Sequence, residues 1–221
     1  MPEANTAPAS RRRDPAPDAV MDQLMARAEP GTDYLVLMGT AGVLAAVAFL
    51  TNSVPMLVGS MIVAPIFSPL ALIGFAHVGN RPEQVQMALR AVGLGLGVAV
   101  LAAMATTFIL NVTNVFPPDE NLFDKPLLKE RLSVGWFSAV SAAAAGIAGN
   151  IALSRDRFDS LIGVLAALAL VPAGAAAGIA LMSGNLGMAF GGLMLLAVNT
   201  GVAVVSGVAT LRWLEGTADK T

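Results

Sequence analysis

Apolar residues in this chain run in long, almost uninterrupted segments. Six such segments follow one another at residues 34–50, about 55–78, about 91–110, 134–153, about 161–182 and 188–211. A helix that crosses a bilayer needs about 20 predominantly apolar residues, with a range of roughly 17–25. No Asp, Glu, Lys or Arg lies deep in any of the six segments. The pattern therefore predicts an all-α, polytopic membrane protein with six transmembrane helices.

The composition supports this class and narrows the chemistry. Hydrophobic residues make up 56% of the chain and charged residues 13%, whereas soluble domains carry about 25% charged residues. The net charge of −2 does not indicate a nucleic-acid partner, so the expected partners are membrane lipids. The chain has no cysteine and a single histidine, His77, which excludes disulfides and thiolate or polyhistidine metal sites. We expect no cofactor.

The domain boundaries follow from the same pattern. Residues 1–30 are rich in proline, alanine and charge and predict a disordered cytoplasmic tail. Apolar residues at helical spacing within residues 19–28 indicate either a short interfacial helix or a turn of soluble helix. Residues 31–213 form the six-helix domain, and 214–221 a second cytoplasmic tail. The first segment also resembles a cleaved signal peptide, but its arginine cluster lies too far upstream, which favours a span.

The basic residues predict how the chain is oriented in the membrane. If the N-terminus is cytoplasmic, ten of the 13 Lys and Arg residues fall on the inside. Only Lys125, Lys129 and Arg131 fall on the outside. Cytoplasmic loops carry an excess of Lys and Arg. We therefore expect a multi-pass membrane protein with both termini cytoplasmic.

The second and third spans share a pattern with the fifth and sixth. The stretch Gly59–Asn80 begins with glycine, has proline mid-span and ends in Gly-Asn, and Gly163–Asn185 does the same after a one-residue gap. Repeat one would cover about 34–110 and repeat two about 134–211. Because each unit holds three spans, the second must cross the membrane in the opposite sense. The pattern predicts a 3+3 inverted repeat, an arrangement common in transporters; chance similarity between two alanine-rich spans is the alternative.

Prolines lie near the middle of the second and fifth spans, at Pro65, Pro69 and Pro172. Each removes a backbone hydrogen bond and clashes with the preceding turn. The result is either a simple kink or a proline-broken helix whose free backbone groups could bind a small solute. The polar residues predicted to line such a path are Ser60, Ser68 and Asn199. The alternative for the two serines is a hydrogen bond to their own helix, and the alternative for Asn199 is a structural hydrogen bond that cross-links two helices.

Small residues recur four apart and predict close helix packing. The pairs are Gly93 with Gly97, Gly174 with Gly178, and Gly187 with Gly191. They either pack the monomer or hold a homo-oligomer together, and the sequence leaves both open.

Three stretches resemble the signature of a bacterial membrane family, domain of unknown function 389. They are Asn52-Ser53, the run from Gly59 to Pro65, and Ser68-Pro69. Leu170-Val171-Pro172 with the later Ala-Ala-Ala-Gly resembles its second motif, and Asn199 falls where the family has an asparagine. The family often has paired prolines where this chain has Pro172-Ala173, and this departure weakens the prediction that the second break is as sharp as the first. The resemblance implies a bacterial inner-membrane protein and supplies no activity.

These features favour a transporter or channel for an unknown small solute, with a path at the repeat interface. No buried carboxylate or histidine relay is present, which disfavours tight coupling to protons. No nucleotide-binding loop or activated nucleophile is visible, so we do not expect an enzyme. The alternative is a structural or lipid-interacting membrane protein without a solute pathway.

Overall fold

A computed structural model describes residues 17–113, 124–133, 135–155 and 169–218, and within these ranges all regular secondary structure is helical. The helices are α1 (Pro17–Ala28), α2 (Thr32–Thr51), α3 (Val54–Val63), α4 (Phe67–Val78), α5 (Pro82–Val112), α6 (Pro126–Arg131), α7 (Trp136–Ser154), α9 (Leu170–Met182) and α10 (Leu186–Ala218). The all-α prediction is confirmed for the described residues.

Four of these helices, α2, α5, α7 and α10, are long and apolar enough to cross a membrane. Helices α3 and α4 pass the same test only as a pair, which would be the fifth span. The sixth predicted span is represented by α9, an apolar helix of 13 residues; residues 161–168 of that span lie outside the described residues. The chain is thus a multi-pass helical membrane protein with four or five candidate spans in its described part.

The predicted second span is broken at Pro65. Helix α3 ends at Val63, and α4 begins at Phe67 with its axis turned by 50°. Ala64 has φ −71° and ψ 117°, the extended conformation into which a proline forces the residue before it. Sequence alone left a kink and a break open, and the structure shows a break.

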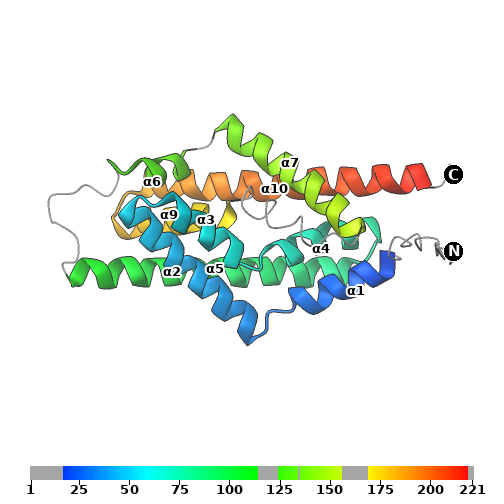
Figure 1. Cartoon of the computed structure of the whole chain (residues 1–221), viewed down its shortest axis with the longest axis horizontal. Coiled ribbons are helices and arrows are strands. Elements are labelled where there is room, and N and C mark those ends of the chain that lie inside the picture. The colour runs from blue at the N-terminus through cyan, green and yellow to red at the C-terminus, as the bar shows by residue number, and fades with distance from the viewer. Residues whose placement is uncertain (1–16, 114–123, 134, 156–168, 219–221) are drawn as a thin grey trace, which may run out of the picture.

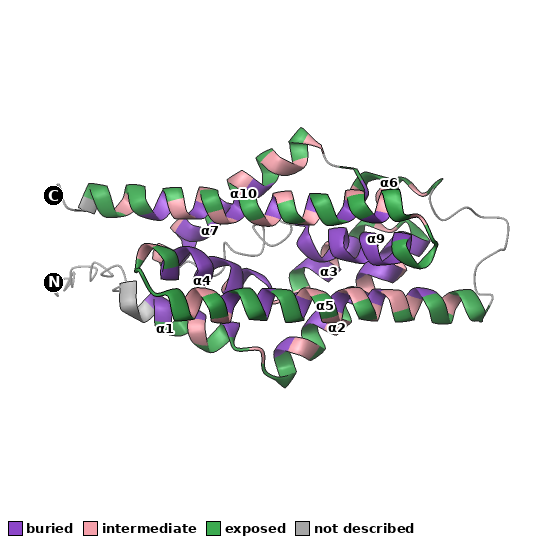
Figure 2. Ribbon diagram, turned by 180° about the vertical axis from the view of Figure 1, so that it is seen from behind, coloured by how far each residue is buried: buried purple, intermediate pink, exposed green. Residues whose placement is uncertain are grey.

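The two longest helices, α5 and α10, lie on either side of a layer of short helices. Helices α5 and α10 run antiparallel, with α3, α4 and α9 between them (Figure 1). Helix α2 packs against α5, and α7 packs against α10, while α4 and α9 each contact both long helices. The short central helices are therefore enclosed by the others, and Figure 2 shows that the buried residues concentrate in them. In α9 every residue from Leu170 to Ala180 is buried.

Two short helices lie beside the central layer at opposite ends of the molecule (Figure 1). Helix α1 packs against α4 through Val20, Met21, Leu24 and Ala28, all of which are buried. Helix α6 packs against α9, and its Leu128 is fully buried. Helix α1 therefore includes all of residues 19–28, where the sequence left an interfacial helix and a turn of soluble helix open.

The start of α1 and the end of α10 lie at the same end of the molecule (Figure 1). Helix α10 continues to Ala218, five residues past the predicted domain boundary at residue 213.

The same close contacts occur in both halves of the chain. A Cβ on Gly42 of α2 would collide with the carbonyl oxygen of Ala99 on α5, and a Cβ on Gly146 of α7 would collide with that of Ala203 on α10. The numbers of Gly146 and Gly42 differ by 104, and so do those of Ala203 and Ala99. Both helix pairs therefore approach to backbone contact at corresponding positions.

A second pair of contacts joins the halves to each other. Gly74 of α4 lies beside Val208 of α10, and Gly178 of α9 lies beside Met104 of α5. These residues again correspond at a separation of 104 positions, with the long helix coming from the other half. Each short helix is thus packed against the partner half in the same way.

Candidate functional site at the helix break

The break leaves the first turn of α4 without intrahelical acceptors. The first backbone bond of this helix runs from Leu70 N–H to the Ile66 carbonyl, at 3.3 Å. The N–H groups of Phe67 and Ser68 precede that bond, and Pro69 has no N–H. Proline is tolerated in the first turn because its missing donor would be free in any case. Pro69 therefore helps to fix where α4 begins.

Helix α9 begins in the same way. Ala173 N–H donates to the Ala169 carbonyl at 3.2 Å, and Leu170, Val171 and Pro172 form the first turn. Ala169 has φ 45° and ψ 30°, a left-handed conformation that costs a non-glycine residue roughly 1–2 kcal/mol. Helical geometry does not continue backwards through Ala169, so the proline in this half also lies in the first turn of a helix.

The two predicted serines differ in their surroundings. Ser60 is fully buried, and its hydroxyl donates to the Leu57 carbonyl of its own helix at 2.7 Å. Ser68 is half-buried and lines an open groove together with Pro65. Ser60 is thus satisfied by its own helix, while Ser68 faces space that a solute could enter.

The groove leads from the connection between α1 and α2 to the helix break. Its volume is about 690 Å³. The residues that line it are Ala26, Arg27, Glu29, Gly31, Thr32, Asp33, Tyr34, Leu37, Pro65 and Ser68. Its wall therefore carries charged, hydroxyl and apolar groups, and it ends at the proline that interrupts the span. Tyr34 is fixed by a hydrogen bond of 3.0 Å from its hydroxyl to the Ala91 carbonyl.

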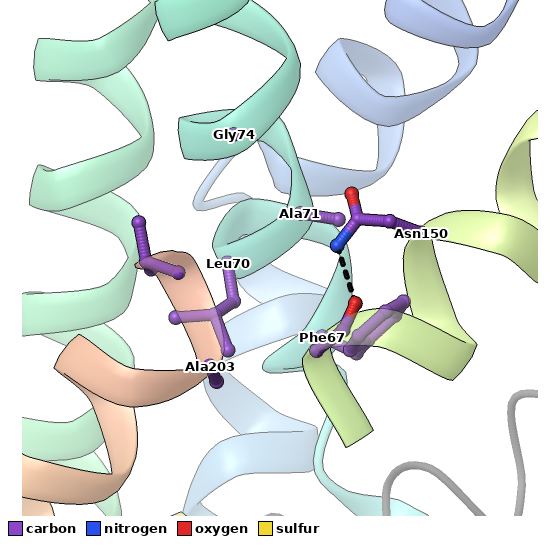
Figure 3. A pocket seen from close by; sticks show the side chains of 8 residues that line it. Phe67, Leu70, Ala71, Gly74, Asn150 and Ala203 are labelled. Atoms are coloured by element: carbon purple, nitrogen blue, oxygen red, sulfur yellow. Dashed lines mark hydrogen bonds between the residues drawn. The ribbon is translucent and has the colours of Figure 1, made fainter. Parts of the chain in front are cut away.

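A small cavity lies where α4 meets α7 and α10. The space open to the centre of a water molecule is about 10 Å³. The lining residues are Phe67, Leu70, Ala71, Gly74, Gly146, Asn150, Ala203 and Val204. Figure 3 shows the Asn150 side chain reaching from α7 toward α4. The cavity is therefore lined by residues from both halves of the chain.

Asn150 is the polar side chain in that cavity. It is 4% exposed, and its Nδ2 donates to the Gly146 carbonyl at 2.8 Å. Its Oδ1 has no hydrogen-bond partner among the described residues. A buried acceptor left unpaired costs about 1–3 kcal/mol, so this atom is an obvious point for a ligand. Asn150 was not predicted as a site residue from the sequence, where the available signal was an amide within an Ala/Gly-rich span.

Asn199 lies deeper in the contact between α7 and α10. It is 1% exposed, and its Oδ1 accepts a hydrogen bond of 2.9 Å from the Ser138 hydroxyl. Its Nδ2 has no partner among the described residues. The bond to Ser138 links two helices, which is the structural role that sequence analysis weighed against solute contact.

The predicted path residues do not line a single cavity. Pro65 and Ser68 line the groove, Ser60 bonds to its own helix, and Asn199 lies against α7. Pro69 and Pro172 are buried in the first turns of α4 and α9. These residues therefore mark the helix break and contacts within each half, and they do not form a continuous path.

The predicted glycines divide into two groups. Gly174 and Gly178 approach Val100 of α5, at 3.1 and 2.8 Å from where their Cβ atoms would lie, and Gly191 approaches the Leu132 carbonyl. Nothing described lies within 4 Å of a Cβ on Gly93 or Gly97, and Gly187 meets only Asn185 of its own turn. The close approaches at Gly42 and Gly146 were not predicted, because the partners lie far away in sequence.

Comparisons with known proteins bear on the same region. A family model described as "Domain of unknown function (DUF389)" matches residues 61–206, which is more than half of the chain. The uncharacterized protein MJ0678 of Methanocaldococcus jannaschii is 21% identical over 189 residues, covering 82% of this chain. The chain spans 56% of the length of that relative. No solved structure matches the chain.

Proposed function

Because this chain belongs to the family described as Domain of unknown function (DUF389) and is built from apolar membrane-spanning helices, we propose that it conducts a small polar solute across a membrane. The path runs at the interface of two inverted halves and is closed in this conformation. The observation that carries the proposal is the broken second span, whose free first turn lies between an open groove and a buried amide.

The inverted repeat is supported by contacts and by placement. One half comprises α1, α2, α3, α4 and α5, and the other comprises α6, α7, α9 and α10. Corresponding glycines make corresponding contacts in the two halves. Helices α1 and α6 lie at opposite ends of the molecule, as an inversion requires (Figure 1). Transporters of this construction bind solutes where the halves meet, at discontinuous helices.

The chemistry of the path favours an uncharged or weakly polar solute. The groove has three charged lining residues, Arg27, Glu29 and Asp33, whereas the cavity beyond α4 offers only an amide and apolar groups. A full charge is costly at bilayer depth without a charged partner. We therefore propose passive conduction without ion coupling and without an enzymatic step.

The proposed location is a cytoplasmic (inner) membrane, with both termini on the cytoplasmic side. The excess of Lys and Arg in the corresponding loops supports this orientation. The start of α1 and the end of α10 lie at one end of the molecule, which fits termini on one side (Figure 1).

A lipid-interacting or structural role is the second candidate, and one observation favours it. The cavity between the halves holds about 10 Å³, close to the minimum for a single water. A path that never opens beyond this volume would pass no solute.

Flux into liposomes separates the two candidates. Proteoliposomes of the purified chain are mixed with urea or glycerol in a stopped-flow instrument, and vesicle swelling is followed by light scattering. We expect protein-dependent entry of at least one of these solutes, lost in Ser68→Leu. The control is Thr40→Leu, because Thr40 is exposed on α2 and its hydroxyl bonds to the Val36 carbonyl of its own helix. Entry no faster than into empty liposomes would favour the structural role.

A further inference from the structure

The cavity between α4, α7 and α10 contains an acceptor without a donor. Asn150 Oδ1 is buried, and its Nδ2 is already used by the Gly146 carbonyl. The other lining side chains are hydrocarbon or glycine, so none of them can donate to Oδ1. The missing donor must come from outside the described residues.

The corresponding place in the other half is closed. Ala46 stands where Asn150 would be after a shift of 104 positions, and Gly178 corresponds to Gly74. A Cβ on Gly178 would lie 2.8 Å from Val100 and 3.0 Å from Met104. A Cβ on Gly74 would lie 3.6 Å from Leu211 and 3.8 Å from Asn150 Oδ1. The cavity beside Gly74 therefore has both free space and an unpaired polar atom. At the corresponding place beside Gly178, an alanine stands where the asparagine would be, and side chains of α5 take up the space.

We propose that Asn150 Oδ1 is the binding point for a hydrogen-bond donor the size of one water molecule. The volume of about 10 Å³ matches the lower limit for holding a single water. The ligand donates one proton to Oδ1, and a second proton can use the spare lone pair of a helix carbonyl in the wall. The site favours a donor over an anion, because its buried acceptor lacks a proton and the lining side chains offer at most the second N–H of Asn150 Nδ2.

We assign the donor to water, which is uncharged like the solute proposed above; an ammonium ion has a similar size but brings a full charge beside a single amide, and the test below separates the two. The site deepens the proposed function and rests on it for its role: it lies where α4 of one half meets α7 and α10 of the other. In that role the site selects small donors over anions. The occupancy of the site is a separate property that does not require flux.

Radiolytic footprinting tests occupancy through Phe67. X-ray pulses produce hydroxyl radicals from bound water, and these modify an adjacent aromatic ring. Phe67 lines the cavity and is only 5% exposed. The reference ring is Phe49, which is fully buried and is not among the lining residues. We expect Phe67 to be modified several-fold faster than Phe49 in an ammonium-free buffer.

Two variants assign the signal to this cavity. Asn150→Leu removes the acceptor, and Gly74→Ala fills space at ordinary contact distance while it keeps the amide. Both should reduce the modification of Phe67 to the rate of Phe49. The control is Gly59→Ala, because nothing described lies within 4 Å of its Cβ; it should leave the rate unchanged.

Each outcome decides a defined point. A drop in Phe67 modification on adding ammonium chloride, compared with sodium chloride, assigns the site to ammonium, and no drop assigns it to water. Equal modification of Phe67 in all variants, or a rate no higher than that of Phe49, would overturn the site. A variant-dependent signal without urea or glycerol flux would reject the proposed function and leave the site standing. Flux of urea or glycerol without a variant-dependent signal would reject the site and leave the proposed function standing.

Discussion

The backbone contact between α2 and α5 makes Gly42→Ala a sharp test of the fold. The added Cβ would collide with the Ala99 carbonyl oxygen, and it would lie 2.8 Å from the carbonyl carbon and 2.9 Å from Cα. All three atoms are backbone, so no side chain can move aside and the two helices must separate. Overpacking of this kind costs about 1–3 kcal/mol, or roughly a 5- to 150-fold shift in the folding equilibrium at about 1.4 kcal/mol per tenfold.

A neighbouring glycine supplies the matched control. A Cβ on Gly39 would lie 3.6 Å from Val98, which is ordinary contact. Gly39→Ala should therefore be neutral or stabilise by up to roughly 1 kcal/mol, since alanine favours a helix over glycine. The measurement is unfolding in mixed micelles with increasing SDS, followed by far-ultraviolet circular dichroism. A Gly42→Ala protein as stable as Gly39→Ala would refute the contact.

Three further outcomes are expected. Gly146→Ala should lower stability in the SDS titration as much as Gly42→Ala, because its Cβ meets the Ala203 carbonyl; a loss in only one variant would argue against equivalent halves. Asn199→Leu should lower stability in the SDS titration by about 0.5–1.5 kcal/mol, because it removes the acceptor of the Ser138 hydroxyl that links α7 to α10; unchanged stability would contradict this structural role. Asn52→Ala should destabilise by about 1–2 kcal/mol, because Asn52 has φ 51° and its Oδ1 accepts the Leu127 N–H at 3.3 Å. Asn52→Gly should recover the part due to backbone strain, and equal stability of the two variants would contradict that reason.

The features predicted best from sequence were those encoded locally. Long apolar runs indicate membrane helices because hydrocarbon leaves few other solutions for the backbone. Pro65 predicted an interruption because proline lacks a donor and constrains its neighbour. The positions of Pro69 and Pro172 in first turns follow the same chemistry.

The features missed were those that depend on pairing distant segments. The Gly42–Ala99 contact joins residues on two different helices, and neither residue carries a signal for its partner. Asn150 is one amide among several, and only the structure shows that its Oδ1 faces a cavity without a donor. Helix α10 extends to Ala218, beyond the last apolar residues, so the end of the apolar pattern did not mark the end of the helix.

The absence of cysteine allows the opposite crossing of the two halves to be measured directly. Glu83 lies in the first turn of α5, just after α4, and Ser183 caps the end of α9, just before α10; both positions are exposed. The variants Glu83→Cys and Ser183→Cys are each labelled with a membrane-impermeant maleimide before and after permeabilisation of spheroplasts. Inverted halves predict that Ser183→Cys reacts in intact spheroplasts and Glu83→Cys reacts only after permeabilisation. Labelling of both cysteines from the same side would contradict the inverted arrangement.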